Sequence, residues 1–229
     1  MIKFRDTNEP DGLSRLINRE IDRALITERA GEVKRDYLGA SVLGDPCDHR
    51  LAYRYAGVEE DGIDGRRLRI FEAGHAFEGM LVRWLRLAGF DLRDLNPDTG
   101  KQFEFSVGGV RGHVDGIIAR GPDLGVSYPL LWEAKSLNDA GWGKLLRNGL
   151  EAANQIYFGQ VQTYLSQLPP IVPYGGVSPV RLKTCLFTAL NKDTCALYHE
   201  LGVDPVWWTV RRLGRLGLLE HLHLVGDWG

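Results

Sequence analysis

The stretch GHVDGIIARGPDLGVSYPLLWEAKS, residues 112–136, decides the fold. It predicts two strands, 111–119 and 130–136, with the turn-rich RGPDLGVSYP between them. Strands of a small mixed fold are usually buried, so their side chains should be apolar. The first strand nevertheless contains Asp115, and the second contains Glu133 with a lysine two residues later. The pattern therefore requires something that stabilises ionisable groups inside a sheet.

Side chains alternate across a strand, so Glu133 and Lys135 share one face. If the two strands pair as antiparallel neighbours, Asp115 lies beside Glu133. Two partly buried carboxylates repel each other unless a cation joins them, and a hard divalent ion such as Mg²⁺ suits oxygen ligands. Lys135 would then orient or deprotonate a water, or stabilise charge on a phosphate. A buried ion pair without a catalytic role is the alternative interpretation.

Two polar residues interrupt the apolar side of a helix expected over 66–89. His75 and Glu78 fall within the arc formed by Ile70, Phe71 and their helical neighbours. Either the two satisfy each other or a backbone group, or His75 is a metal ligand and Glu78 acts through a ligand or a bound water.

A further helix, expected over 151–168, carries Gln160 one turn before Tyr164. Near an anionic site, these two side chains can hold a phosphate oxygen by hydrogen bonds. Ordinary packing with a satisfied amide explains the spacing equally well.

The order of elements predicts an α/β fold, with a central mixed sheet flanked by helices and an N-terminal helical extension. We expect one domain, divided into an N-terminal helical part (1–60), a core (61–200) and a C-terminal helix (201–229). The expected helices are 13–30, 46–55, 66–89, 151–168 and 205–225, and the remaining strands are 102–107, 181–190 and 195–200.

Composition narrows the possible classes of protein. The chain has 229 residues, of which 44% are hydrophobic, and a formal net charge of −2, so any basic surface must be local. Three widely spaced cysteines favour a reducing compartment over a disulfide framework. The N-terminus does not resemble a signal peptide, and no apolar run approaches the roughly 18 residues of a membrane span. We therefore expect a cytoplasmic protein without a membrane partner.

Five short segments, taken in order, resemble the PD-(D/E)XK nuclease superfamily, in its RecB-like exonuclease branch. They match a first helical motif, a histidine helix, a G-x-x-D strand, a (D/E)-x-K strand and a Q-x-x-x-Y helix. Together with FTALNKDTCALYHE, which resembles the strand pair of phage members, they cover residues 37–200. The segments are GASVLGDPCDHRLAYRYAG, FEAGHAFEG, GHVDGII, LLWEAKS and YFGQVQTYL.

This resemblance implies a restriction-endonuclease-like core and metal-dependent cleavage of DNA with Mg²⁺ or Mn²⁺. By position, the metal ligands are His75, Asp115, Glu133 and the backbone carbonyl of Ala134, the catalytic lysine is Lys135, and Gln160 and Tyr164 match the Q-x-x-x-Y residues.

Two departures from the family pattern are visible. Val114 stands where the family name has proline, with little consequence for the chemistry. Some relatives hold an iron–sulfur cluster on four cysteines, but this chain has three, so we expect no cluster. Cys47 stands in a plausible first position, whereas Cys185 and Cys195 fit buried strand positions.

Contacts with DNA should come from local basic groups. The segment 136–149 is expected to be a loop in which Lys144 and Arg147 meet phosphates and Trp142 stacks on an unpaired base. A solvated loop anchored by its tryptophan is the alternative. The last expected helix adds three arginines that either contact DNA or have only a surface role: Arg211, Arg212 and Arg215.

The sequence thus predicts an exonuclease that acts on linear duplex or single-stranded DNA in recombination, repair or replication. Its compact form resembles nucleases of phages or mobile elements, for which a single-strand annealing or binding protein is a candidate partner. A structure-specific or restriction-like endonuclease, and a non-catalytic DNA-binding accessory module, are the alternatives. Strand polarity, the number of metal ions and the oligomeric state stay open.

Overall fold

The computed structural model describes residues 12–32, 35–58, 62–172 and 178–203, together with Arg212, Arg215 and Gly217. The chain divides into two compact units. The first comprises Met1–Arg35 and Glu60–Ala76, and the second comprises Asp36–Glu59 and Phe77–Gly229.

The first unit contains helix α1 (Leu13–Ala30) and the beginning of helix α3 (Gly65–Leu87). The helix expected over 13–30 is confirmed, but none of its side chains is buried. An ion pair joins Asp22 of α1 to Arg69 of α3. A Cβ on Gly65 would lie 2.5 Å from the Cα of Asp22, so the absence of a side chain permits this close approach.

The second unit is built on two mixed β-sheets. The larger sheet has the order β2 (Asp91–Arg93), β5 (Gly116–Arg120), β6 (Leu130–Leu137), β7 (Thr184–Asn191) and β8 (Leu197–Val203). Only β6 and β7 are parallel neighbours within it. The smaller sheet has the order β1 (Leu38–Gly39), β4 (Val110–His113) and β3 (Glu104–Val107), in which β1 is parallel to β4.

Strands β4 and β5 are consecutive but belong to different sheets, because the chain bends between them at Val114 and Asp115. Val114 is fully buried, and its N–H donates to the carbonyl of Phe103 at 3.0 Å. The sequence predicted one uninterrupted strand over 111–119, and this is wrong at Asp115. The bend places Asp115 at the junction of the two sheets, between the end of β4 and the start of β5.

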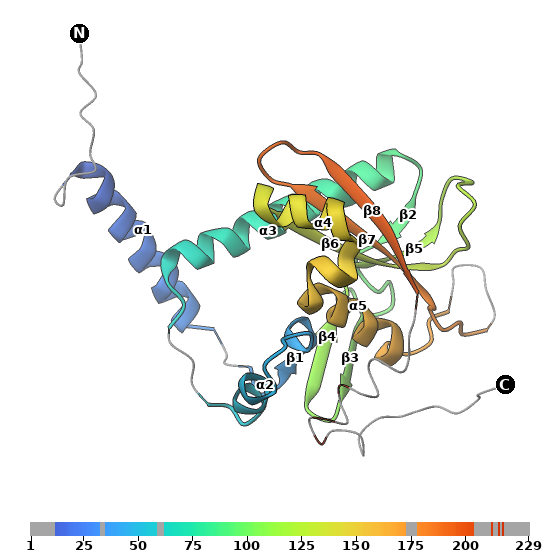
Figure 1. The fold of residues 1–229 in the computed structure, drawn as a ribbon, viewed down its shortest axis with the longest axis horizontal. Helices are drawn as coiled ribbons and strands as arrows, with labels where there is room; N and C mark the ends of the chain where they lie inside the picture. The colour runs from blue at the N-terminus through green and yellow to red at the C-terminus, as the bar shows by residue number, and fades with distance from the viewer. Residues whose placement is uncertain are drawn as a thin grey trace, which may run out of the picture. The chain divides into compact units, whose positions relative to one another are not determined.

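The parallel connection from β6 to β7 passes through two helices, α4 (Asp139–Ala153) and α5 (Gln155–Gln167), which cover one face of these strands (Figure 1). The preceding helices of this unit are the 3₁₀ turn η1 (Ala40–Val42), α2 (Asp48–Tyr55) and the part of α3 from Phe77 onward. A right-handed crossover of this length is the usual solution for parallel neighbours.

Helix α4 occupies most of the segment that the sequence predicted as a loop. Asn138 caps it, since its side chain accepts a hydrogen bond from the N–H of Gly141 at 2.9 Å. Gly149 interrupts the helix with a φ of 69°, and the Glu200 carboxylate accepts the N–H of Leu150 at 2.9 Å beyond this kink. The helix therefore forms in spite of its glycines, because side chains satisfy both of its irregular points.

Each face of the large sheet has its own apolar cluster. On one face, Trp132 of β6 packs with Leu81 and Val82 of α3. On the other face, Phe187 of β7 packs with Val161 of α5. This two-sided burial explains why the first five residues of β6 and the last five residues of β7 are all buried.

The predicted α/β class, with a mixed sheet flanked by helices, is confirmed. On α3, however, the apolar side expected to face the core starts only at Phe77, since Ile70 and Phe71 are exposed. No helix among the described residues is both long enough and apolar enough to span a membrane. The helix expected over 205–225 lies outside the described residues except for Arg212, Arg215 and Gly217.

Candidate active site

Asp115, Glu133 and Lys135 converge where β5 meets β6. Gly116 pairs with Trp132 in the antiparallel ladder, which brings Asp115 next to Glu133. The Asp115 Oδ2 accepts a hydrogen bond from the backbone N–H of Ala134 at 2.8 Å. The Lys135 ammonium contacts the Glu133 Oε1. The antiparallel pairing that the sequence predicted for these strands is therefore confirmed.

The site brings two carboxyl groups and one ammonium group together at different degrees of burial. The Glu133 side chain is fully buried, whereas the Lys135 side chain is 20% exposed. Burial, followed by the negative charge of Asp115, raises the pKa of Glu133 to about 8, although Lys135 opposes the shift. Burial lowers the pKa of Lys135, but the charges of Glu133 and Asp115 outweigh it and hold the pKa above its usual value. Lys135 is thus held as a cation beside the carboxyl groups of Glu133 and Asp115.

Gln160 and Tyr164 lie close to this cluster on the buried side of α5. The Gln160 Nε2 donates to the Tyr164 hydroxyl at 2.9 Å. Burial, followed by the charges of Glu133 and Asp115, raises the pKa of Tyr164 well above its usual value, so the hydroxyl stays protonated. The Tyr164 O–H is therefore available to donate a hydrogen bond toward an anion.

Gly112 of β4 makes room for this tyrosine. A Cβ at this position would lie 2.6 Å from the Tyr164 Cε1 and 2.5 Å from the Phe105 Cε1. Phe105 and Tyr164 pack edge to face, with ring centroids 6.0 Å apart. The first residue of the G-x-x-D segment is therefore a glycine for a steric reason in this chain, because a larger side chain would clash with these two rings.

Two buried acceptors in this region, the Glu133 Oε2 and the Gln160 Oε1, have no hydrogen-bond partner among the described residues. Unpaired buried acceptors are costly, and a cation or a donor group removes the cost. The charge and the oxygen donors of Asp115 and Glu133 fit a hard divalent cation. Within the described part of the chain, no three His, Cys, Asp or Glu side chains form a ready-made metal cluster.

Glu78 of α3 contributes its charge to the same site, since it raises the pKa of Glu133 as a smaller effect after burial and Asp115. His75 is exposed and belongs to the first unit, so the expectation that it faces the core is wrong, and its assignment as a metal ligand stays a prediction. Ala134 contacts Asp115 through its backbone N–H and not through its carbonyl. A ligand role for its carbonyl likewise stays a prediction.

Tyr157 is the neighbour of the site that the sequence reasoning missed. The Lys135 Nζ lies 5.5 Å from the centroid of the Tyr157 ring, over its face. Tyr157 is seven residues before Tyr164 on α5, so helical periodicity already placed both on one side.

The expected DNA-contacting residues lie on α4. Lys144 and Arg147 are exposed, and Trp142 is half-buried with its ring edge-on to Tyr198 at a centroid distance of 6.5 Å. Their roles stay predictions. Arg212 instead ties its own chain together, because its guanidinium donates to the carbonyls of Leu43 and Asp45 and pairs with Asp48.

All three cysteines are free thiols. Cys185 is buried in β7, as expected, but Cys195 is exposed in the turn before β8 with a φ of 58°. The prediction of a buried strand position for Cys195 is therefore wrong. The turn is fixed instead by the Asn191 side chain, which accepts the N–H groups of Asp193 and Thr194.

No protein-family model and no curated protein matches the chain. Two crystal structures show a distant likeness in fold. One, of the protein SSO0001, is 16% identical over 93% of this chain and 90% of the other, with a TM-score of 0.47. The second is an alkaline exonuclease (LHK-Exo) from Laribacter hongkongensis, which is 15% identical over 86% of this chain and 90% of the other, with a TM-score of 0.48.

Proposed function

We propose that this chain is a metal-dependent DNA exonuclease that hydrolyses phosphodiester bonds. The observation that carries the proposal is the convergence of Asp115, Glu133 and Lys135, in which one oxygen of the fully buried Glu133 has no partner in the part of the chain that the structure describes. An ion pair alone would not need the second carboxylate. The proposal also draws on the order of the five segments that resemble the RecB-like nucleases.

Asp115 and Glu133 would hold the cation, Mg²⁺ or Mn²⁺, together with the predicted contributions of His75 and the Ala134 carbonyl. When bound, a divalent cation supplies a Lewis acid to the scissile phosphate. A histidine ligand makes Mn²⁺ a credible choice, since imidazole suits softer ions.

Lys135 stabilises negative charge at the phosphate and orients the attacking water. Its ammonium contacts the Glu133 Oε1 and so lies beside the proposed cation and its phosphate. The Tyr164 O–H and the amide of Gln160 hold phosphate oxygens beside it. Glu78 lies close enough to influence Glu133 and would act on the ligands through a water.

The substrate is linear DNA, duplex or single-stranded, whose phosphates meet Lys144 and Arg147 on α4. A role in recombination, repair or replication of a phage or mobile element, with a single-strand annealing or binding protein as partner, follows from the same resemblance.

A degradation assay on the wild-type chain tests the proposal. End-labelled linear duplex, end-labelled single strands and covalently closed circular DNA are each incubated with Mg²⁺, Mn²⁺ or EDTA. We expect mononucleotides or short products from linear DNA with either metal, and none in EDTA.

The closed circle separates the two enzymatic candidates, because an exonuclease leaves it intact and an endonuclease opens it. DNA binding without cleavage of any substrate would favour the accessory module and contradict the proposal. The presence of both carboxyl groups, Asp115 and Glu133, beside Lys135 argues against that module.

A further inference from the structure

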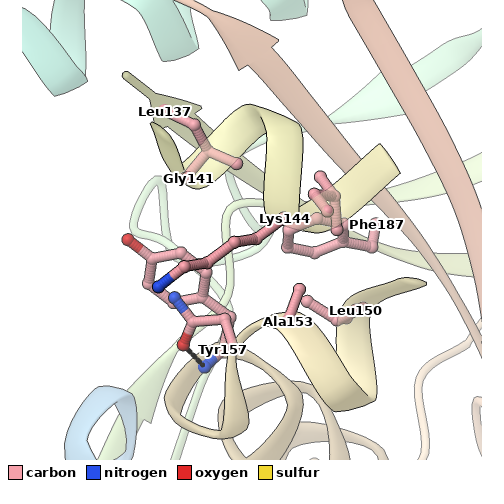
Figure 2. Close-up of a pocket in the computed structure, with 9 residues that line it drawn as sticks. Leu137, Gly141, Lys144, Leu150, Ala153, Tyr157 and Phe187 are labelled. Carbon is pink, nitrogen blue, oxygen red and sulfur yellow. Dashed lines mark hydrogen bonds between the residues drawn. The ribbon is translucent and has the colours of Figure 1, made fainter. Parts of the chain in front are cut away.

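A cavity of about 130 Å³ lies between α4, α5, the end of β6 and the middle of β7 (Figure 2). Its apolar walls come from Leu137, Leu145, Leu150, Ala153 and Phe187. Its polar borders come from Lys144, Asn154 and Tyr157. Figure 2 shows Lys144 and Tyr157 extending to the same side of the cavity.

The cavity continues the row of side chains that forms the candidate active site. Glu133, Lys135 and Leu137 follow one another on the same face of β6, and Leu137 belongs to the wall. The step from Lys135 to Leu137 along the strand is roughly 7 Å. Phe187, another wall residue, is the register partner of Glu133 on β7.

Tyr157 connects the two regions directly. Its ring lines the cavity and also receives the Lys135 ammonium over its face, at 5.5 Å from the centroid. If a phosphate binds at Lys135, a group attached to that phosphate therefore lies next to the Tyr157 ring and the apolar walls of the cavity.

The lining fits a flat ring with a polar edge. An engineered protein cavity of roughly 150 Å³ holds benzene, so this one has room for one aromatic ring. Base–aromatic stacking is sequence-tolerant, because every base has a π-face that suits Tyr157 and apolar walls. The Asn154 Oδ1 is used as the cap of α5, which leaves its Nδ2 without a bond to any described residue and free to donate to a base edge.

We propose that this cavity receives the unpaired base of the nucleotide next to the scissile phosphate, so that the enzyme acts on a single-stranded or frayed end. The inference rests on the proposed function and adds the form of its substrate. Lys144, at the mouth, contacts the phosphate of the same nucleotide. Trp142, by contrast, packs against Tyr198 and does not line the cavity.

Binding in EDTA tests the proposal without any cleavage. The variant Ala153→Leu fills the cavity, and Ala152→Leu, at the exposed neighbouring position of α4, is the matched control. With a single-stranded oligonucleotide, fluorescence anisotropy should show about a tenfold loss of affinity for Ala153→Leu, as expected for one stacked base. Ala152→Leu should stay close to the wild type.

A single abasic nucleotide, moved along the oligonucleotide one position at a time, identifies the bound base. When the abasic site is at the position of the bound base, the wild type should bind that strand as weakly as Ala153→Leu binds the normal strand. Ala153→Leu should bind this abasic strand with the same affinity as the wild type does. Equal affinity of all three proteins for all strands would overturn the proposal. If Ala153→Leu does not fold, Ala153→Val replaces it, with Ala152→Val as the control.

Free deoxynucleoside monophosphate serves as the second arm. If it binds the wild type as tightly as the oligonucleotide does, and loses affinity in Ala153→Leu, the cavity belongs to a released product and the proposal is wrong. The degradation assay keeps the two claims apart. A wild type that does not cleave DNA defeats the proposed function, whereas a wild type that cleaves while Ala153→Leu binds normally defeats only this inference.

Discussion

The Asp115 carboxylate accepts the backbone N–H of Ala134 at 2.8 Å, across the junction between β5 and β6. Ala134 stands between Glu133 and Lys135, so this single hydrogen bond fixes the first carboxylate against the strand that carries the other two groups. The bond forms where the chain passes from the small sheet to the large one, because the pairing of β4 with β3 ends at His113 and the pairing of β5 with β6 starts at Gly116.

Divalent cations should stabilise the folded protein through Glu133. At about a hundredfold excess over Kd, Mn²⁺ should raise the Tm of the wild type by roughly 5–10 °C, because ligand binding to the folded state adds free energy of unfolding. Glu133→Gln should lose most of this rise, since an amide oxygen binds a cation less strongly than a carboxylate does. Differential scanning calorimetry with EDTA and with Mn²⁺ measures the effect.

The matched control is Glu151→Gln, on the exposed side of α4, which should keep the full response to Mn²⁺. A response that survives in Glu133→Gln would place the cation elsewhere.

Gly112→Ala should destabilise the chain and disturb Tyr164. The added Cβ would lie 2.5 Å from one ring and 2.6 Å from the other, so Phe105 or Tyr164 must move. Overpacking of this kind costs about 1–3 kcal/mol in the free energy of unfolding, which urea titration measures. Cleavage should also fall, because the Tyr164 hydroxyl leaves its bond to Gln160.

Gly79→Ala is the control for the same chemical change. Gly79 lies in α3, where a Cβ would meet no heavy atom within 4 Å, so alanine should stabilise the helix by about 0.5–1 kcal/mol. If the two variants have the same stability, the steric account of Gly112 is wrong.

Acidification below about pH 6.5 should weaken the fold through His199. The Trp132 Nε1–H donates to the Thr188 hydroxyl at 3.1 Å, and that hydroxyl lies 3.1 Å from the His199 Nδ1. Burial lowers the pKa of His199, so the unfolded chain takes up this proton first as the pH falls. The stabilisation is therefore fully present above pH 6.5 and is lost on acidification.

Urea denaturation between pH 8 and pH 5 measures this contribution as the difference between the wild type and His199→Gln, because Glu133, whose pKa is raised, acts in the opposite direction in both proteins. The stability of His199→Gln relative to the wild type should rise as the pH falls. Leu124→Gln, at an exposed position without an ionisable group, should leave the slope unchanged. Equal slopes in the wild type and in His199→Gln would show that other groups control acid stability.

The strands and helices that carry the site could be predicted from the sequence because their patterns are strong. Alternation placed Glu133 and Lys135 on one face, and helical spacing placed Gln160 beside Tyr164. The bend at Asp115 was missed, because apolar residues continue on both sides of it and only the pairing of two separate sheets reveals it.

Helix α4 was missed for a different reason. Glycines at 141, 143 and 149 lower helix propensity, and the Glu200 carboxylate that satisfies the kink comes from β8, about fifty residues later in the chain. Such a long-range cap leaves no local signal. The cavity beside Lys135 depends on this helix, so sequence reasoning alone had no means to find it.

The most direct test of the nuclease account is single-turnover cleavage of end-labelled linear DNA by the wild type and by Lys135→Ala, in Mn²⁺ and at neutral pH. We expect the rate to fall by at least roughly 100-fold in Lys135→Ala, with DNA affinity nearly unchanged. The same substitution at exposed Lys192 should leave the rate unaltered. Cleavage by Lys135→Ala at the rate of the wild type would contradict the account.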